Sequence, residues 1–596
     1  MTAARRWLGP LAAGLVVGLY TAAFRHYGIF DLADEGTLLL QAARVAHGQA
    51  PYIDFHTGYG TLYFALQGLL VRLGGVGAVR AVLVGVHAGV AALLFALARR
   101  TAGHALAVVA VALEVSFFLP LAPRQGAPFF VPYPAWYGTL AGLLMMLLLG
   151  DGRIGLLRAA CLGVLAGAVF AMKQNTGLLL EGGAAALLVL AARPSTLGSA
   201  VLGLLSLGAV VLVASTGFTA AAWVLAPPVL ALTTLGAGRD RSVDPAERQL
   251  VALGAGFVAV AAICYVPSLL VLGPERFARE VLLVGAGVAG VYVLPFTWPA
   301  TLAAAVGAAA FLGASRRSVR PFLALAVLAT LLVAVLVGAA GPAGFRMALR
   351  RGAEEAALAL VPLILWGALA VCRRRREAML LAPTTIAVAT APVLYPRPDF
   401  SHLMHIAPLL LPLALLLWRI MVDTAALPRR AATMLVLGLP LLAAGLRFAP
   451  TVELLARLVS GRVEAIQVGP VRLIGTPESA APLHALAAAV DELAARTSVD
   501  ERVLSFPACG VVPFFAGRLP AGRHDYFYPG RPDRAEMDAF LAALGPVPPH
   551  LAVTCAPTSA ELGNAWRYYP SMVDVLSTRY RVIVDHPPFA LRERRD

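Results

Sequence analysis

The stretch LLRAACLGVLAGAVFAMKQNTGLLLEGGAAALLVLAAR, residues 156–193, decides the fold class. Two apolar runs flank the polar turn AMKQNTG, and the arginines stand near the outer ends of the stretch. An apolar run of roughly 20 residues is long enough to cross a bilayer as a helix. The stretch therefore predicts a helical hairpin in a membrane, with its polar turn at one surface.

The composition extends this prediction to the whole chain. Of its 596 residues, 59% are hydrophobic and only 14% are charged, whereas soluble domains carry about 25% charged residues. We therefore predict a polytopic α-helical membrane protein, with membrane lipids as partners. The formal charge of +15 does not indicate nucleic acid, because the arginines form short clusters between apolar runs, as the positive-inside rule produces.

The apolar runs predict about 13–15 transmembrane helices. The first run has a basic start, but no small-residue cleavage site follows it, so we interpret it as a retained helix. The predicted helices are 7–24, 76–98, 104–120, 136–150, 154–172, 177–192, 197–217, 219–237, 250–272, 294–314, 321–340, 354–371, 378–394, 404–421 and 432–448.

Arginine bias sets the expected orientation, with the amino terminus inside. Four polar segments then fall outside together: the first external loop 25–75, the loop 121–135, the AMKQNTG turn and YPRPDFSHLMH at 395–405. Within the first loop, 36–47 and 61–75 are predicted as helices lying along the membrane surface. The richness in Ala, Arg and Gly is typical of GC-rich bacterial genomes, so the expected location is the bacterial cytoplasmic membrane.

The composition changes near residue 450, which divides the chain into a transmembrane domain, 1–449, and a small α/β extracytoplasmic domain, 450–596. Predicted strands are 502–508, 549–556 and 579–586, and predicted helices are 480–496, 533–544 and 564–578. Cys509 and Cys555 each follow a strand. Two alternatives stay open for them: a disulfide, if the domain lies in an oxidising compartment, or simple burial, which is common for cysteines at strand ends.

Asp34 and Glu35 are adjacent carboxylates just beyond the first helix. Neighbouring side chains on a helix point about 100° apart, so the two acids are expected to do different jobs. One can face a reaction centre while the other orients it. The alternative is structural, with Asp34 as the N-cap of the helix 36–47.

Lys173 is the only lysine among 48 basic residues, and it stands beside Gln174 in the AMKQNTG turn. A lysine is a compact point charge with three rotatable donors, which suits a phosphate that shifts during a reaction. The alternatives are a lysine that extends its stem along lipid and its charge to water, or drift in codon usage.

The segment YPRPDFSHLMH places Arg397, Asp399, His402 and His405 at the outer end of a helix. His402 and His405 share a helical face. A solvated helix start, or Arg397 anchored to lipid headgroups, is the structural alternative. A metal site formed by Asp399, His402, His405 and Asp34 is a further alternative, but the spacing matches no strong zinc pattern, so we expect no metal.

The run ADEG, a helix, and then HGQAPYIDFHTGYGTLYFAL resembles the first external loop of family 39-like glycosyltransferases of the GT-C superfamily, such as protein O-mannosyltransferases and lipid A aminoarabinose transferases. The KQN turn, RPDFSHLMH and FFAGRLPAGRHDYFYPG resemble bacterial members. The resemblance covers most of the chain and is densest in residues 30–80. The form of the tail departs from that of the best-known members, so the acceptor stays open among glycan, lipid and protein.

The resemblance implies an inverting transfer of a sugar from a polyprenyl-phosphate donor to a hydroxyl acceptor on the outer face, with no cofactor. Asp34 is implied as the general base, and Glu35 orients it or binds the acceptor. The implied phosphate ligands are Lys173, Arg397, Gln174 and His402. The implied substrate contacts are His56, Tyr59, Asp399 and His405.

Two other classes of function stay open. Glu114 and Glu181 lie in apolar stretches, which favours a transporter or a lipid-linked glycan flippase. Transporters, however, tend to place their binding groups at the bilayer midplane in paired repeats, and here the polar groups gather at one surface. The third class is a non-catalytic assembly partner with the tail as its interaction module.

The predicted orientation places residues 56–60 outside the cell. Gly58→Cys should therefore react with a membrane-impermeant maleimide in intact cells, measured by gel shift against the unsubstituted protein. Labelling that appears only after the membrane is permeabilised would reverse the orientation.

Overall fold

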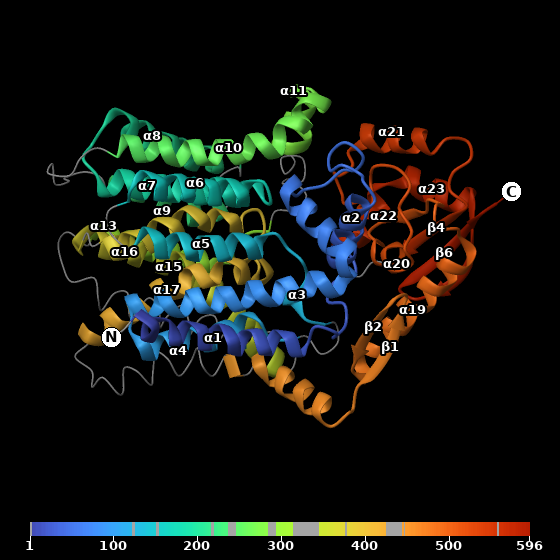
Figure 1. Ribbon diagram of the computed structural model, residues 1–596, viewed down its shortest axis with the longest axis horizontal. Coiled ribbons are helices and arrows are strands. Elements are labelled where there is room, and N and C mark those ends of the chain that lie inside the picture. Colours follow the sequence, from blue (N-terminus) through green and yellow to red (C-terminus); the bar gives the residue numbers. More distant parts are fainter. Residues whose placement is uncertain are drawn as a thin grey trace.

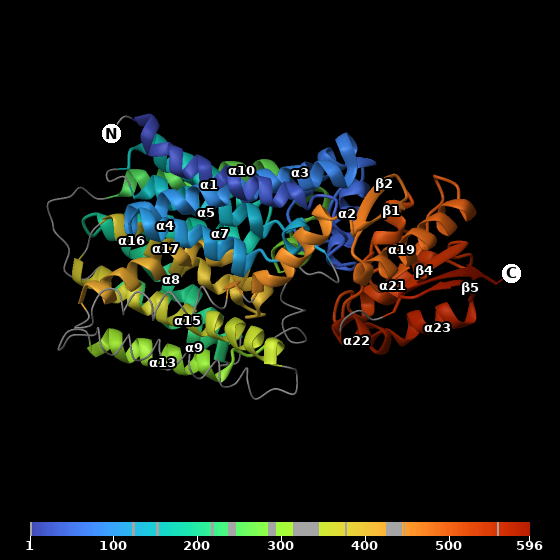
Figure 2. The same ribbon diagram turned by 90° about the horizontal axis from the view of Figure 1, so that it is seen from below.

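The computed structural model describes residues 3–595 apart from 122–125, 151–153, 216–219, 236–245, 284–293, 314–344, 376–377, 425–443, 446 and 557–559. It consists of a bundle of apolar helices and a smaller mixed domain at one end of that bundle (Figure 1). The turned view keeps the two parts end to end (Figure 2). The predicted class, a polytopic helical protein with a C-terminal α/β domain, is confirmed.

Six described helices are long and apolar enough to cross a membrane. They are α3 (Thr61–Thr101), α7 (Gln174–Ala191), α8 (Thr196–Ser215), α10 (Glu247–Leu272), α15 (Phe345–Arg375) and α17 (Phe400–Thr424). The shorter apolar helices are α1 (Ala3–Ala23), α4 (His104–Leu113) continuing as η1 (Glu114–Phe118), α5 (Ala135–Leu149), α6 (Leu156–Phe170), α9 (Ala220–Thr234), α13 (Trp298–Gly313) and α16 (Ala378–Thr390). The predicted helix 321–340 and nearly all of 432–448 lie outside the described residues.

Glycines set the closest contacts inside the bundle. A Cβ at Gly163 of α6 would lie 1.8 Å from the carbonyl oxygen of Leu253, and one at Gly256 of α10 would lie 2.3 Å from that of Ala160. Small residues at such an interface let two membrane helices approach backbone to backbone. In the quoted hairpin, Gly177 approaches Phe170 in the same way, which allows the tight turn around Lys173.

Both helices predicted in the first external loop are present. The helix predicted at 36–47 is α2 (Asp34–Ala46). The helix predicted at 61–75 is the first part of α3, and the non-helical dihedral angles of Gly74 and Gly75 separate it from the long helix that follows. Gly75 has φ +57°, a conformation that glycine adopts without steric cost. The chain therefore kinks there, at the predicted boundary between the helices 61–75 and 76–98. That the first of these helices lies along the membrane surface stays a prediction.

The C-terminal domain is built on a four-stranded sheet of order β3-β4-β6-β5, in which only β3 and β4 are parallel. The strands are β3 (Leu504–Phe506), β4 (Leu551–Cys555), β5 (Tyr580–His586) and β6 (Phe589–Arg594). The helices are α19 (Pro477–Arg496), α20 (Val511–Phe515), α21 (Arg534–Leu544), α22 (Ala560–Tyr568) and α23 (Pro570–Thr578). The single helix predicted at 564–578 is wrong, because Pro570 begins a new helix.

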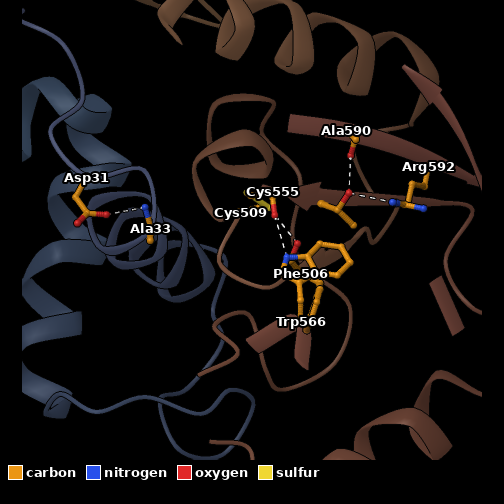
Figure 3. The surroundings of a disulfide bond; sticks show 9 residues. Asp31, Ala33, Phe506, Cys509, Cys555, Trp566, Ala590 and Arg592 are labelled. Carbon is orange, nitrogen blue, oxygen red and sulfur yellow. Dashed lines mark hydrogen bonds between the residues drawn. A yellow bond between two sulfur atoms is a disulfide. The ribbon is translucent and has the colours of Figure 1, made fainter. Parts of the chain in front are cut away.

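Cys509 and Cys555 form a disulfide, with their Cα atoms 5.7 Å apart. Cys509 follows β3 and Cys555 ends β4, so the bond joins the ends of two parallel strands. Figure 3 draws this bond together with Asp31 and Ala33 of the first loop, and Ala33 packs against Ala508. Of the two alternatives left open for these cysteines, disulfide or simple burial, the structure shows the disulfide. It lies where the C-terminal domain meets the first loop.

A hairpin of β1 (Glu464–Val468) and β2 (Val471–Gly475) attaches the C-terminal domain to the end of α1. Gly28 N donates to Ile474 O at 3.0 Å, and Ile474 N donates to His26 O at 2.7 Å. These bonds form an isolated parallel bridge between Tyr27 and Ile474, so a segment about 450 residues earlier pairs with the open edge of the hairpin. The hairpin was not among the predicted strands.

The second attachment runs along α2. Gly36 and Gly510 face each other closely: a Cβ at Gly36 would lie 2.6 Å from the backbone nitrogen of Val511. Farther along α2, Arg44 forms an ion pair with Asp525 at 3.2 Å, and both side chains are buried. Gln41 donates to the other oxygen of Asp525 at 2.8 Å. These contacts fix the position of the C-terminal domain along α2.

Gly36→Ala should separate these elements, because the new methyl group would overlap the backbone of Val511. We expect a loss of about 1–3 kcal/mol of stability and faster release of the C-terminal domain by limited proteolysis. Thermal unfolding in detergent measures the first effect. Gly85→Ala is the matched control, since no atom lies within 4 Å of its added methyl. Equal melting temperatures for both variants would contradict this packing.

Candidate active site

The four segments predicted to lie outside meet at the end of the bundle that carries the C-terminal domain. Gly60 N of the first loop donates to Met172 O of the AMKQNTG turn at 2.9 Å. Tyr63 OH donates to Pro132 O of the 121–135 loop at 2.5 Å. The ring of Tyr133 from that loop lies edge-on to His405, with centroids 5.4 Å apart. The predicted convergence is confirmed.

Asp34 stands at the centre of this meeting point, at the first position of α2. Tyr133 OH donates to its Oδ2 at 2.5 Å, and Tyr526 OH of the C-terminal domain donates to its Oδ1 at 3.3 Å. The backbone N–H groups at the helix start are bound instead by Asp31, whose Oδ1 accepts from Ala33 and Asp34 at 2.8 and 2.9 Å. The alternative in which Asp34 caps the helix is therefore wrong.

The surroundings of Asp34 favour a carboxylate that accepts protons near neutral pH. Burial raises its pKa to about 6, and the charge of Asp31 adds to the increase. The two tyrosine hydroxyls and the charge of Arg397 act in the opposite direction. A carboxyl group with a pKa near the working pH is suited to general base catalysis.

Glu35 points away from Asp34. Its Oε1 accepts from Arg80 Nη2 of α3 at 2.8 Å, both side chains are buried, and its Oε2 accepts from Phe30 N at 3.0 Å. The two acids thus do different jobs, as the 100° spacing predicts. Glu35 fixes α2 against the bundle and has no contact with Asp34, so a direct catalytic role does not follow from its position.

Lys173 lies between α6 and α7, at the residue that precedes α7. Among the described residues, its ammonium group has no hydrogen bond or ion pair, and burial lowers its pKa to about 8. Its charge acts on the ring of His405, which packs against Tyr133. The N-terminus of α7 adds its own partial positive charge at this point.

Gln174, the neighbour of Lys173, is engaged elsewhere. Its amide donates to Tyr52 OH at 2.9 Å and to Val281 O at 3.5 Å. These bonds pack the turn against the first loop and against η3 (Ala278–Leu282). The predicted role as a phosphate ligand would require Gln174 to exchange both bonds.

Arg397, Asp399 and His402 form one group at the start of α17. Asp399 accepts from both the backbone and the ring of His402, at 2.9 and 2.8 Å, and lies 3.2 Å from Arg397 Nε. Burial alone would raise the pKa of Asp399, but His402 and Arg397 hold it below its usual value. Asp399 therefore orients Arg397 and His402, and the charge of Arg397 acts on Asp34.

His405 is buried between the rings of Tyr133 and Trp136, the latter at a centroid distance of 4.3 Å. Its Nε2 has no hydrogen-bond partner in the part of the chain that the structure describes. Tyr59 is near enough to act on the Tyr133 hydroxyl. His405 and Tyr59, both predicted as substrate contacts, therefore lie next to Tyr133, the hydrogen-bond partner of Asp34.

His56 lies farther into the contact between the first loop and the C-terminal domain. Its ring centroid is 5.4 Å from that of His524, and burial together with the charge of Arg531 holds its pKa well below the usual value. No described contact joins His56 to Asp34, so the sugar contact predicted for it stays a prediction.

Three residues of the cluster were not among the predicted site residues: Tyr133, Tyr526 and Arg80. Tyr133 belongs to a loop that the topology placed outside, and Tyr526 belongs to a tail segment noted only for its resemblance. Nothing in the spacing of either tyrosine marks it as a partner of Asp34. Arg80 stands in an apolar run, where an arginine is costly unless it is paired, and that cost is the signal that could have identified it.

The arrangement combines a carboxylate base, Asp34, with the cations Lys173 and Arg397. Asp34 can take a proton from a hydroxyl group. Lys173 and the Arg397–His402 pair can bind and stabilise an anion that gains charge. No metal-binding group of three or more His, Cys, Asp or Glu is found among the described residues.

Comparisons with known proteins add little. No protein-family model matches the chain, and no curated protein does. Among solved structures, it is similar to the crystal structure of an Archaeoglobus fulgidus oligosaccharyltransferase tethered with an acceptor peptide, at 12% identity and a TM-score of 0.43, over 92% of this chain and 69% of that one. Similarity at this level does not assign a function.

Proposed function

We propose that this protein is an inverting glycosyltransferase of the bacterial cytoplasmic membrane. It moves a sugar from a polyprenyl-phosphate donor to a hydroxyl group of a glycan, lipid or protein on the outer face. The observation that carries the proposal is one continuous cluster. The Asp34 carboxylate accepts a hydrogen bond from Tyr133, and Tyr133 packs on His405. The charge of Lys173, which has no partner among the described residues, acts on His405.

Asp34 acts as the general base in this proposal. It removes the proton of the acceptor hydroxyl while that oxygen attacks the anomeric carbon of the donor. The bond between the anomeric carbon and the phosphate oxygen breaks, and the configuration inverts. Since only the ionised carboxylate can take the proton, transfer should rise with pH through the pKa of Asp34, about 6.

The leaving group is a lipid phosphate, which gains negative charge as its bond to the sugar breaks. Lys173 and Arg397 are the candidate cations for its oxygens, and His402 is a candidate hydrogen-bond donor. Such preorganised groups stabilise a developing charge more strongly when bulk water is excluded. A buried ammonium group without a partner is costly in the free protein, and an anionic substrate would offset that cost.

Asp34→Asn should abolish transfer and leave folding intact, because an amide cannot accept the proton. A general base contributes about 10²–10⁴-fold to the rate. The measurement is mass spectrometry of envelope glycans from a strain that lacks the gene, complemented with the wild-type or the variant protein. Restoration of the missing glycan by Asp34→Asn would remove Asp34 as the base.

Lys173→Ala should lower transfer by roughly 10²-fold, the effect of losing one group that stabilises developing charge. Lys173→Arg keeps the charge and should be partly active. The same complementation assay, quantified over time, compares the two variants. Wild-type rates in both would favour the alternative in which Lys173 only extends along lipid.

A specific observation favours the transporter alternative. Both carboxylate oxygens of Glu114 are buried without a hydrogen-bond partner among the described residues, as is Oε2 of Glu181. Glu114 also opens η1, a π-helical turn of the kind often found at functional sites. A transporter would lose its function in Glu114→Gln and keep it in Asp34→Asn, which is the reverse of the transferase result.

A further inference from the structure

The residues around Tyr526 fix its position from both sides. Asp525 forms the buried ion pair with Arg44 of α2. The side chain of Phe527 belongs to the core of the C-terminal domain, and its N–H donates to Pro507 O at 2.7 Å. Tyr526 therefore stands between an anchor on the first loop and an anchor in its own domain. A side chain between two such anchors has little freedom to move away from Asp34.

We propose that the C-terminal domain is part of the catalytic unit, because its Tyr526 acts with Tyr133 as a positioning residue for the Asp34 carboxylate. This inference rests on the proposed function for its catalytic meaning, but the contact itself can be tested without a substrate. The C-terminal domain would then contribute to catalysis through Tyr526, in addition to being attached to α2.

The two tyrosines bind Asp34 unequally. The bond from Tyr133 is 2.5 Å long, whereas that from Tyr526 is 3.3 Å, well beyond the most common O–H···O distance of about 2.7–2.8 Å. Tyr133 is therefore the strong partner, which fixes Oδ2. Oδ1 is held weakly on the side of the C-terminal domain, and it is the oxygen that an acceptor hydroxyl can reach by sharing or displacing the bond from Tyr526.

Several charged groups face Asp34 from the elements around it. Asp31 lies in its own loop, and Arg397 precedes α17. His405 packs against Tyr133, and the charge of Lys173 acts on His405. The Glu35–Arg80 pair is internally neutralised on the bundle side. Against this fixed background, the two hydroxyls are the neutral donors that favour the ionised form of Asp34.

The test is a pH titration of the Asp34 carboxyl group by infrared difference spectroscopy on the full chain in lipid nanodiscs. The band that disappears in Asp34→Asn identifies the group. Tyr526→Phe should move the titration to higher pH, because one donor to the carboxylate is lost. Tyr133→Phe should move it further in the same direction. A fluorinated tyrosine at position 526, a stronger donor, should move it to lower pH.

Tyr568→Phe is the matched control, since Tyr568 is an exposed tyrosine of the same domain. In the complementation assay, Tyr526→Phe should lower transfer about tenfold. An unmoved titration in a folded Tyr526→Phe protein overturns the positioning role. A moved titration together with full activity of Asp34→Asn supports the contact and rejects the proposed function, so the two failures are distinguishable.

Discussion

The helix α2 is held at its two ends by buried ion pairs to different parts of the molecule. Near its start, Glu35 binds Arg80 of the membrane bundle; near its end, Arg44 binds Asp525 of the C-terminal domain. All four side chains are at most 2% exposed. Removing one partner of such a pair costs about 3–5 kcal/mol, because the other charge is left buried and unpaired. The place of α2 between the two domains depends on both pairs.

The ion pair at the start of α2 gives the adjacent acids Asp34 and Glu35 different roles. Glu35 is neutralised by a guanidinium group, so its charge is committed to structure. Asp34 accepts hydrogen bonds from the hydroxyl groups of Tyr133 and Tyr526. Arg397 acts on Asp34 only through its charge. A carboxylate bound by neutral donors in a desolvated place keeps a raised pKa and stays available as a base. The different surroundings, more than the residue types, give the two acids their different roles.

Much of this architecture could be predicted from local pattern. Apolar length predicted the membrane helices, and arginine bias predicted which polar segments would meet at one end of the bundle. The strand-end positions of Cys509 and Cys555 left a disulfide and simple burial both open, and the packing of the two strands decided between them. The missed features depend on distant packing. Tyr526 is 492 residues from Asp34, and the edge pairing of β2 with residues 26–28 joins segments with no shared periodicity. The break at Gly74 and Gly75, in contrast, follows from local pattern, because glycine adopts non-helical dihedral angles at little steric cost.

The central claim is that one pocket holds both the base and the cations that receive the lipid phosphate. The most direct measurement is a structure of the protein in nanodiscs with a bound polyprenyl-phosphate sugar, determined by cryo-electron microscopy. The account predicts the phosphate against Lys173 and Arg397, with the anomeric carbon facing Asp34 and the lipid chain directed toward the bundle. A phosphate bound at a different surface of the bundle, with Lys173 turned into lipid, would contradict it.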